Sequence, residues 1–262
     1  MLVNNMIMTK RWATLAAAVA GFIWLFTQGV GAQGTALRVL ASNGVKGAME
    51  EVQPQCEREI GRPLAVQFSS TAALKKRIEA GESFDVTIIT SEALSNLEKQ
   101  GKIARASRVA LGRSELGIGI RAGAAKPDIH TTEALKTTLR TAKSITFPQD
   151  GATRGDIEKM LERLGIATEV QPRIILAPSS GAATQSVAEG KAAMVITLFS
   201  EIVPVHGVEI LGALPGEFER YVSFEAAANA ATNNGDASKA LIAFLTGPKA
   251  APTFKAKGVA RR

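Results

Sequence analysis

Short apolar runs alternate with helix-like segments along most of this 262-residue chain, and this alternation limits the folds open to it. Runs rich in Val, Ile, Leu and Phe predict buried strands, whereas apolar residues three and four apart predict amphipathic helices. In the first set the expected strands are 37–41, 64–68 and 84–89, and the expected helices are 45–60, 72–80 and 92–100. This repeated order predicts an α/β fold with a parallel sheet covered by helices.

A second set of strands and helices follows a long apolar run at 116–120. Its expected helices are 133–141, 156–164 and 182–189, and its expected strands are 144–147, 173–176 and 193–198. A late strand at 208–211 and helices at 238–245 and 249–257 end the chain. Because the second set interrupts the first, we expect two lobes joined by two crossing strands. The first lobe is expected from residues 36–113 and 214–262, and the second from 114–205.

The first 32 residues have the composition of a cleavable secretory signal peptide. Lys10-Arg11 precede an apolar run from Trp12 to Phe26, and Val30-Gly31-Ala32 places small residues before a cleavage site near Ala32. The run has roughly 15 residues, fewer than the ~18–20 that span a bilayer. No cysteine follows it, which argues against a lipid anchor. We expect a periplasmic protein without a stable membrane anchor; the alternative is an uncleaved signal anchor.

Composition argues against several classes of function. Removal of Lys10 and Arg11 leaves 29 basic against 24 acidic residues, a scattered surplus of +5. This surplus lacks the basic stripe with interleaved aromatic residues that binds nucleic acid. Two distant histidines and one cysteine do not give metal-ligand spacing. Cys56 follows the apolar spacing of a helical segment, so it is expected in the core. We expect a monomer whose partner is a small anion.

Four expected strand-to-helix junctions are small and polar, and they fall two in each lobe. They are Ser42-Asn43-Gly44, Ser69-Ser70-Thr71, 151–155 and Ser179-Ser180-Gly181. In open parallel sheets, ligands bind beyond the carboxyl ends of the strands, where helix N-termini attract anions. Each junction alone has the residues of an ordinary N-cap. Together they predict an anion-binding cleft between the lobes.

Several segments between residues 36 and 258 resemble the molybdate-binding branch of the type 2 periplasmic-binding fold. The matching stretches are Ala48-Met49, Phe68-Ser69-Ser70-Thr71, Ile78-Glu79-Ala80-Gly81, Phe84-Asp85-Val86, Leu161-Glu162-Arg163-Leu164-Gly165, Phe244-Leu245-Thr246-Gly247-Pro248, Phe254-Lys255 and Gly258. The resemblance implies a two-lobed fold that holds its ligand between the lobes. For most members it also implies a receptor that delivers its solute to an ABC permease.

The ligand-binding loops depart from the pattern of that family, which holds a tetrahedral dianion with neutral donors. Alignment on Ala48-Met49 puts Gly44 at the position of the first serine. The position of the second serine falls on Thr71, and the position of a late tyrosine falls on Leu198. Two of the family's hydroxyl donors are therefore missing, which makes molybdate a poor match for this chain.

Two cations replace the missing hydroxyls in the predicted cleft. Lys46 lies close to the first loop, and Arg154 lies in the third loop, which is normally neutral. Cationic donors suit carboxylates, which guanidinium groups bind through two parallel hydrogen bonds. The alternative is that both side chains point into solvent. The expected substrate-binding residues are Asn43, Gly44, Lys46, Ser70, Thr71, Arg154, Gly155, Ser179, Ser180 and Leu198.

The aconitate isomerases are an enzymatic branch with this fold, and the chain resembles them in its export, its lack of a lipid anchor and its cationic loops. This resemblance implies a periplasmic isomerase that interconverts cis- and trans-aconitate by an allylic proton shift, without metal or cofactor. The alternative is the receptor of an ABC importer for a molybdate-like oxyanion or a di- or tricarboxylate. The catalytic base stays open among Glu201, Asp150 and Asp156, each of which also fits a helix cap or a surface acid.

Overall fold

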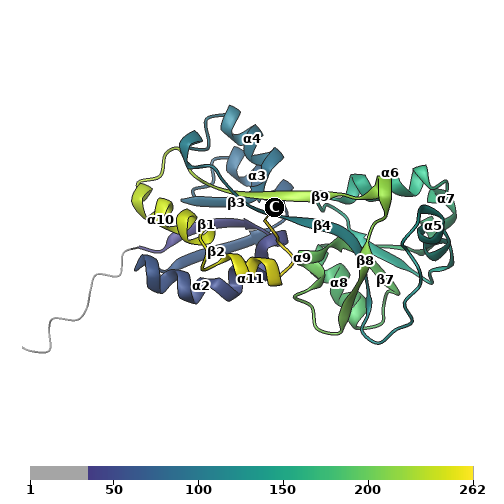
Figure 1. Ribbon diagram of the computed structural model, residues 1–262. Coiled ribbons are helices and arrows are strands. Elements are labelled where there is room, and N and C mark those ends of the chain that lie inside the picture. The colour runs from purple at the N-terminus through teal and green to yellow at the C-terminus, as the bar shows by residue number, and fades with distance from the viewer. Residues whose placement is uncertain (1–34, 262) are drawn as a thin grey trace, which may run out of the picture. The chain divides into compact units, whose positions relative to one another are not determined.

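Residues 35–261 are described by the computed structural model, and the predicted signal peptide at 1–32 lies outside them. Within them the chain alternates strands and helices (Figure 1). The elements before the long central strand are β1 (Leu37–Ser42), α2 (Lys46–Ile60), β2 (Leu64–Ser69), α3 (Thr71–Glu79), β3 (Val86–Thr90) and α4 (Ser91–Lys99). A short 3-10 turn, η1 (Asn43–Val45), joins β1 to α2. No helix in this described part is both long and apolar enough to cross a bilayer.

The second set of elements begins with the long strand β4 (Val109–Arg121). It continues with α5 (Thr132–Thr141), β5 (Ile145–Pro148), α6 (Arg154–Arg163), α7 (Ala167–Val170), β6 (Ile174–Ala177), α8 (Ser180–Ala188), β7 (Met194–Leu198), α9 (Phe199–Ile202) and β8 (Val208–Ala213). The chain closes with β9 (Tyr221–Ala228), α10 (Gly235–Leu245) and α11 (Ala251–Ala256). The interrupted order that the sequence predicts is therefore present.

The strands pair in the order β2-β1-β3-β9-β4-β7-β5-β6, with β8 also paired to β4. β1 runs parallel to β2 and β3, and β5 runs parallel to β6 and β7. The first half of β4 pairs antiparallel with β9, and its second half pairs antiparallel with β7 and β8. The fold thus has two lobes, each a sheet with three parallel strands extended by antiparallel ones and flanked by helices, and β4 and the segment entering β9 cross between them (Figure 1). The residue boundaries expected for the lobes stay a prediction.

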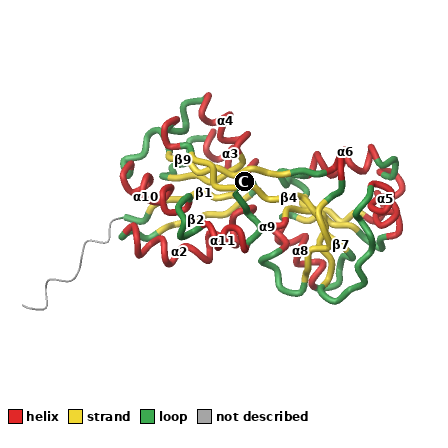
Figure 2. The backbone as a smooth tube through the Cα atoms, viewed as in Figure 1, coloured by secondary structure: helices red, strands yellow, loops and turns green. Residues whose placement is uncertain are grey.

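Successive side chains of β1 point to opposite faces of the sheet, as a strand requires. Leu37, Val39 and Ala41 pack in one core together with α2, whereas Leu40 packs in another with α3 and α4. The tube view shows the strands inside and the helices outside in this lobe (Figure 2). Cys56 of α2 is completely buried in the first of these cores, and burial raises the pKa of its thiol to about 12.

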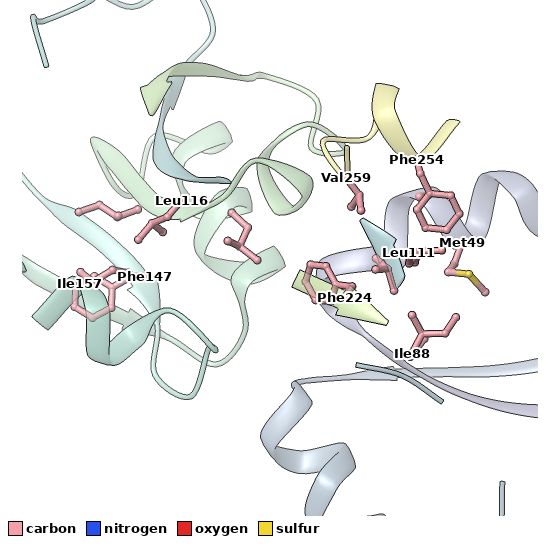
Figure 3. Close-up of a cluster of buried hydrophobic side chains, with 14 of the residues drawn as sticks. Met49, Ile88, Leu111, Leu116, Phe147, Ile157, Phe224, Phe254 and Val259 are labelled. Carbon is pink, nitrogen blue, oxygen red and sulfur yellow. The ribbon is translucent and has the colours of Figure 1, made fainter. Parts of the chain in front are cut away.

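Strand β4 contributes side chains to the cores of both lobes. Its Leu111 lies beside Phe224 and Val259, whereas its Leu116 lies toward Phe147 in the other lobe (Figure 3). All of these residues are at most 1% exposed. The crossing strand is therefore held in a packed core at both ends, which fixes the loops of each lobe relative to the strand that links them.

The structure contains one central strand that the apolar pattern does not predict. Strand β9 lies between β3 and β4, and β4 itself begins at Val109, seven residues before the run expected at 116–120. The second half of β9 reads Glu-Ala-Ala-Ala, a composition without the β-branched residues that mark strands. Its place in the sheet comes from the neighbouring strands on both sides rather than from its own propensity.

A buried carboxylate connects β1, β3 and the loop before α10. Asp85 is 2% exposed, and it accepts hydrogen bonds from the backbone N–H of Arg38 at 2.8 Å, the Thr232 hydroxyl at 2.7 Å and the Asn234 amide at 3.0 Å. Burial raises the pKa of this carboxyl, but the hydrogen bonds from Asn234, Arg38 and Thr232 outweigh it, so the net pKa is lowered.

Asp85→Asn is expected to lower the free energy of unfolding by about 1.5 kcal/mol at pH 7, because a charge-assisted acceptor is lost. A carboxyl with a lowered pKa stabilises the fold above its unfolded pKa, about 3.9, and loses this contribution as the pH falls through the folded value. The free energies of unfolding of the parent protein and of Asp85→Asn should therefore differ less in acid than at pH 7. Urea unfolding at pH 7 and pH 3 measures this difference; equal stabilities at pH 7 would contradict the role given to Asp85.

Candidate functional site

Residues from all four small polar junctions line one cavity of about 330 Å³. Its walls are formed by Ser42, Asn43, Gly44, Phe68, Ser69, Ser70, Thr71, Asp150, Gly151, Ala152, Thr153, Pro178, Ser179, Ser180, Leu198, Glu201 and Phe224. These residues come from both lobes and from the crossing strand β9. The volume is near the lower limit of about 300 Å³ for small-molecule pockets, so the cavity has room for an organic anion.

Helix N-termini supply the polar part of this cavity. Ser70 caps α3 by accepting a hydrogen bond from the Ala73 N–H at 3.2 Å, and Ser179 caps α8 by accepting one from the Ala182 N–H at 3.2 Å. A serine oxygen that accepts a capping bond still has an O–H to donate. Because the first N–H groups of each helix lack an intrahelical acceptor and carry a positive end charge, the same ends attract anions. Capping and ligand binding are therefore compatible here.

The remaining wall is apolar. Phe68, Leu198 and Phe224 line the cavity beside the polar loops. Phe224 also explains why a glycine occupies the first loop: a Cβ on Gly44 would lie 2.3 Å from the Cζ atom of the Phe224 ring. The cavity therefore offers contacts to a carbon skeleton as well as donors to oxygen atoms, whereas a bare tetrahedral oxyanion would use only the donors.

Glu201, one of the three candidate bases, lies in this wall on the short helix α9. Its carboxylate accepts hydrogen bonds from the hydroxyls of Thr197 and Ser180 and from the backbone of Leu198. Burial nevertheless dominates and raises the pKa of Glu201 above the ordinary glutamate value. A carboxyl with a raised pKa at the wall of a ligand cavity is the pattern of a general acid or base.

Asp150, a second candidate base, lines the same cavity but is exposed to solvent. It accepts a hydrogen bond from the Ser70 hydroxyl at 3.4 Å, so a loop of the second lobe contacts a loop of the first. Asp156, the third candidate, is outside the lining and lies 3.6 Å from Arg220 in an ion pair. Of the three acids, Glu201 therefore combines contact with the cavity and a desolvated carboxyl.

The two predicted cations lie outside the lining of this cavity, as does Gly155. The Arg154 guanidinium donates to the carboxylate of Glu158 at 2.9 Å, one turn further along α6, and to the backbone carbonyl of Gln149. Lys46 instead lines a neighbouring cavity. Among residues 35–261, neither lysine nor arginine lines the first cavity, so the cationic interlobe cleft expected from the sequence is a cleft of neutral donors and two acids in this structure.

Several lining residues were not among those predicted from the sequence. Ser42, Ser69 and Thr153 lie inside the predicted junctions, so the local N-cap pattern already pointed to them. Phe68 is the last residue of the strand expected at 64–68, directly before one of these junctions. Phe224 is different, because it lies on the strand that the sequence did not reveal, and nothing in its local sequence indicated a ligand site.

Comparison with known proteins is consistent with this architecture. The profile of a family described as bacterial extracellular solute-binding protein matches residues 37–260. An aconitate isomerase from Pseudomonas sp is 30% identical over 233 residues, which cover 86% of this chain and 87% of that protein. The molybdate-binding protein ModA of Escherichia coli K12 is 23% identical over 255 residues, which cover 96% of this chain and 98% of that protein.

Solved structures show the same fold. The periplasmic molybdate-binding protein of Azotobacter vinelandii superposes with a TM-score of 0.73 at 21% identity, covering 86% of this chain and 99% of that one. A substrate-binding domain of a putative molybdenum ABC transporter from Clostridium difficile gives a TM-score of 0.68 at 16% identity, covering 87% and 100%. With the match of the family profile over nearly all of the described residues, the chain belongs to the family of bacterial extracellular solute-binding proteins.

Proposed function

We propose that this protein is an isomerase that interconverts trans- and cis-aconitate in the cavity between its lobes. The observation that carries the proposal is Glu201, a desolvated carboxyl with a raised pKa in the wall of a cavity otherwise rich in neutral donors. A solute receptor gains nothing from such a group, whereas proton abstraction requires a base poised near the working pH. The similarity to an aconitate isomerase, at 30% identity, supports the same assignment.

The substrate carboxylates are held by helix N-termini and hydroxyls rather than by Arg154. The ends of α3 and α8 supply backbone N–H groups. The hydroxyls of Ser70, Thr71 and Ser180 donate to Asp150, Ser42 and Glu201 in this structure, and they turn to the substrate when it binds. Preorganised neutral donors of this kind stabilise a developing negative charge by several kcal/mol when water is excluded. The carbon skeleton of aconitate lies against Phe68 and Leu198. A tetrahedral oxyanion has no carbon atoms to contact these two side chains.

The proposed chemistry is a 1,3-proton shift. The Glu201 carboxylate removes one proton from the CH₂ group of aconitate, and the electron pair left on carbon is delocalised over the adjoining double bond and its carboxylates. The protonated Glu201 then returns a proton to the carbon at the other end of the three-carbon unit. One proton leaves and one returns, so the reaction needs no electron acceptor and the double bond moves by one position.

Purified protein is expected to convert trans-aconitate to cis-aconitate without added cofactor, and proton NMR follows both isomers directly. In D₂O some product should carry deuterium at its CH₂ group, because the proton taken up by Glu201 can exchange with solvent before it is returned to carbon. Protein that binds trans-aconitate tightly but produces neither isomer nor deuterium exchange would contradict the proposal. Heat-treated protein serves as the control for uncatalysed isomerisation.

A receptor for an ABC importer is the second candidate, and the neutral donors of the cavity favour it. Molybdate-binding relatives are similar over nearly the whole chain, and tight binding without chemistry is all that this role requires. In that case the ligand is a small anion, the partner is a permease, and the protein acts outside the cytoplasm. Thermal shifts with molybdate, sulfate and trans-aconitate separate a molybdate receptor from the isomerase, because such a receptor should respond to molybdate and ignore the carboxylate. A receptor for a di- or tricarboxylate would instead be distinguished by binding trans-aconitate without isomerising it.

A further inference from the structure

A second cavity of about 280 Å³ adjoins the first and shares the wall residues Asn43, Ser179 and Glu201 with it. Its other walls come from the start of α2, from α8 and from α9 and the loop that follows it. Glu201 therefore lies between two compartments. A ligand whose reacting carbon lies beside Glu201 has room to extend into either one.

Lys46 brings a positive charge to this second compartment. It lines the cavity, and its ammonium lies 5.8 Å from the ring centroid of Phe68, which lines the first compartment. Its nearest carboxylate is Glu50, also in the wall, at 3.7 Å. Because that distance exceeds the range of an N–H···O hydrogen bond, Lys46 keeps its donors available for a ligand. Both side chains are half exposed, so the ion pair itself is weak.

Ser200 gives the second, independent indication of a ligand. This residue is 3% exposed and lines the second compartment, yet its Oγ has no hydrogen-bond partner among the described residues. Buried hydroxyls are almost always paired, because an unmade hydrogen bond costs about 1–3 kcal/mol. Lys46 and Ser200 both line this compartment, so a carboxylate bound there would have an ammonium and an unpaired hydroxyl among the residues of its wall.

We propose that the second compartment is a subsite for one further carboxylate of the substrate, with Lys46 as its counter-charge and Ser200 as a donor. This inference rests on the proposed function and narrows it. The site then selects tricarboxylates over dicarboxylates of otherwise equal shape. The carboxylate concerned is the one attached to the reacting CH₂ group, since that group must lie beside Glu201, between the two compartments.

A pair of ligands tests the subsite directly. Mesaconate is trans-aconitate with a methyl group in place of the CH₂-carboxylate arm, so it lacks only the carboxylate assigned to Lys46. Lys46→Met is expected to weaken trans-aconitate binding about tenfold, the loss of one charge-assisted hydrogen bond, and to leave mesaconate binding within twofold. Ser200→Ala should give a smaller loss with the same selectivity. Lys126→Met, which removes a lysine paired with Glu209 outside both cavities, is the matched control.

The outcomes separate this subsite from the proposed reaction. Equal losses for both ligands in Lys46→Met, or no loss for either, would overturn the subsite while isomerisation by the parent protein still supported the enzyme. The expected selectivity in a protein that never isomerises aconitate would support the subsite and overturn the enzyme. Failure of the parent protein to bind either carboxylate in calorimetry would overturn both.

Discussion

Glu201→Gln is expected to lower kcat for aconitate isomerisation about a thousandfold, within the range of 10²–10⁴ that a positioned general base contributes. Glutamine has nearly the same shape, and its amide oxygen can still accept a hydrogen bond from the Thr197 or the Ser180 hydroxyl. Affinity for trans-aconitate should therefore stay within a few-fold, because the donors that hold the carboxylates are untouched. Isomer formation by NMR and binding by calorimetry give the two numbers separately.

The same substitution is expected to keep or raise the stability of the fold near neutral pH. A group whose folded pKa is raised stabilises the protein below its unfolded pKa and loses that contribution as the pH rises through the folded value. Replacing Glu201 with a neutral amide removes this penalty. A fall in activity combined with an unchanged or higher Tm then reports lost chemistry rather than lost structure.

The pH dependence of the parent enzyme should report the same carboxyl. Because only the ionised base removes a proton, kcat/KM is expected to fall as the pH drops through the raised pKa of Glu201, above the usual glutamate range. Asp156→Asn is the matched control, since its carboxylate pairs with Arg220 outside the cavity and its loss should leave the rate unchanged. If the rate were unaffected by Glu201→Gln but lost in Asp150→Asn, the base would be Asp150 and not Glu201.

Local chemistry explains which parts of the site were predictable from the sequence. Ser70 and Ser179 stand at helix starts, where cap preferences are local, so the junctions were found and the structure brings them to one cavity. Burial is not local: Glu201 was one of three acids chosen by position, and only the packing of α9 against the cavity distinguishes it. The sequence also contained a signal against Arg154, because Glu158 follows it at the i,i+4 spacing of a helical ion pair.

The strand β9 shows the other limit of prediction from the sequence. Its alanine-rich half resembles a helix more than a strand, and it is held by pairing with β3 and β4, which lie far away in the sequence. Phe224 lies on β9 and lines the cavity, so its place in the site could not be predicted from the sequence. The sequence showed that Gly44 replaces a serine of the related family. It did not show why, because the space for a side chain at this position is taken by the ring of Phe224.

Gly44→Ser, which restores the serine of the related family, is expected to destabilise this protein by about 3 kcal/mol, the upper part of the range for overpacking a core. The new Cβ would lie 2.3 Å from Cζ of Phe224, and that ring is 1% exposed, so it has little room to move. Binding of trans-aconitate should weaken as well, since any shift of the first loop or of Phe224 changes the wall of the cavity. Urea unfolding and calorimetry measure the two effects.

Phe224→Leu is expected to rescue the serine, because leucine has no atom at the position of Cζ. The double variant Gly44→Ser/Phe224→Leu should then be more stable than the sum of the single variants predicts, by about 1–2 kcal/mol, the size of a coupling between residues in contact. Its cavity also gains a hydroxyl and loses an aromatic wall, so its preference should shift from carboxylates toward tetrahedral oxyanions, measured as thermal shifts with trans-aconitate and molybdate. Strictly additive single variants would mean that Phe224 does not exclude the serine. Coupling would instead show that one aromatic ring on a crossing strand determines the donor set of the first loop.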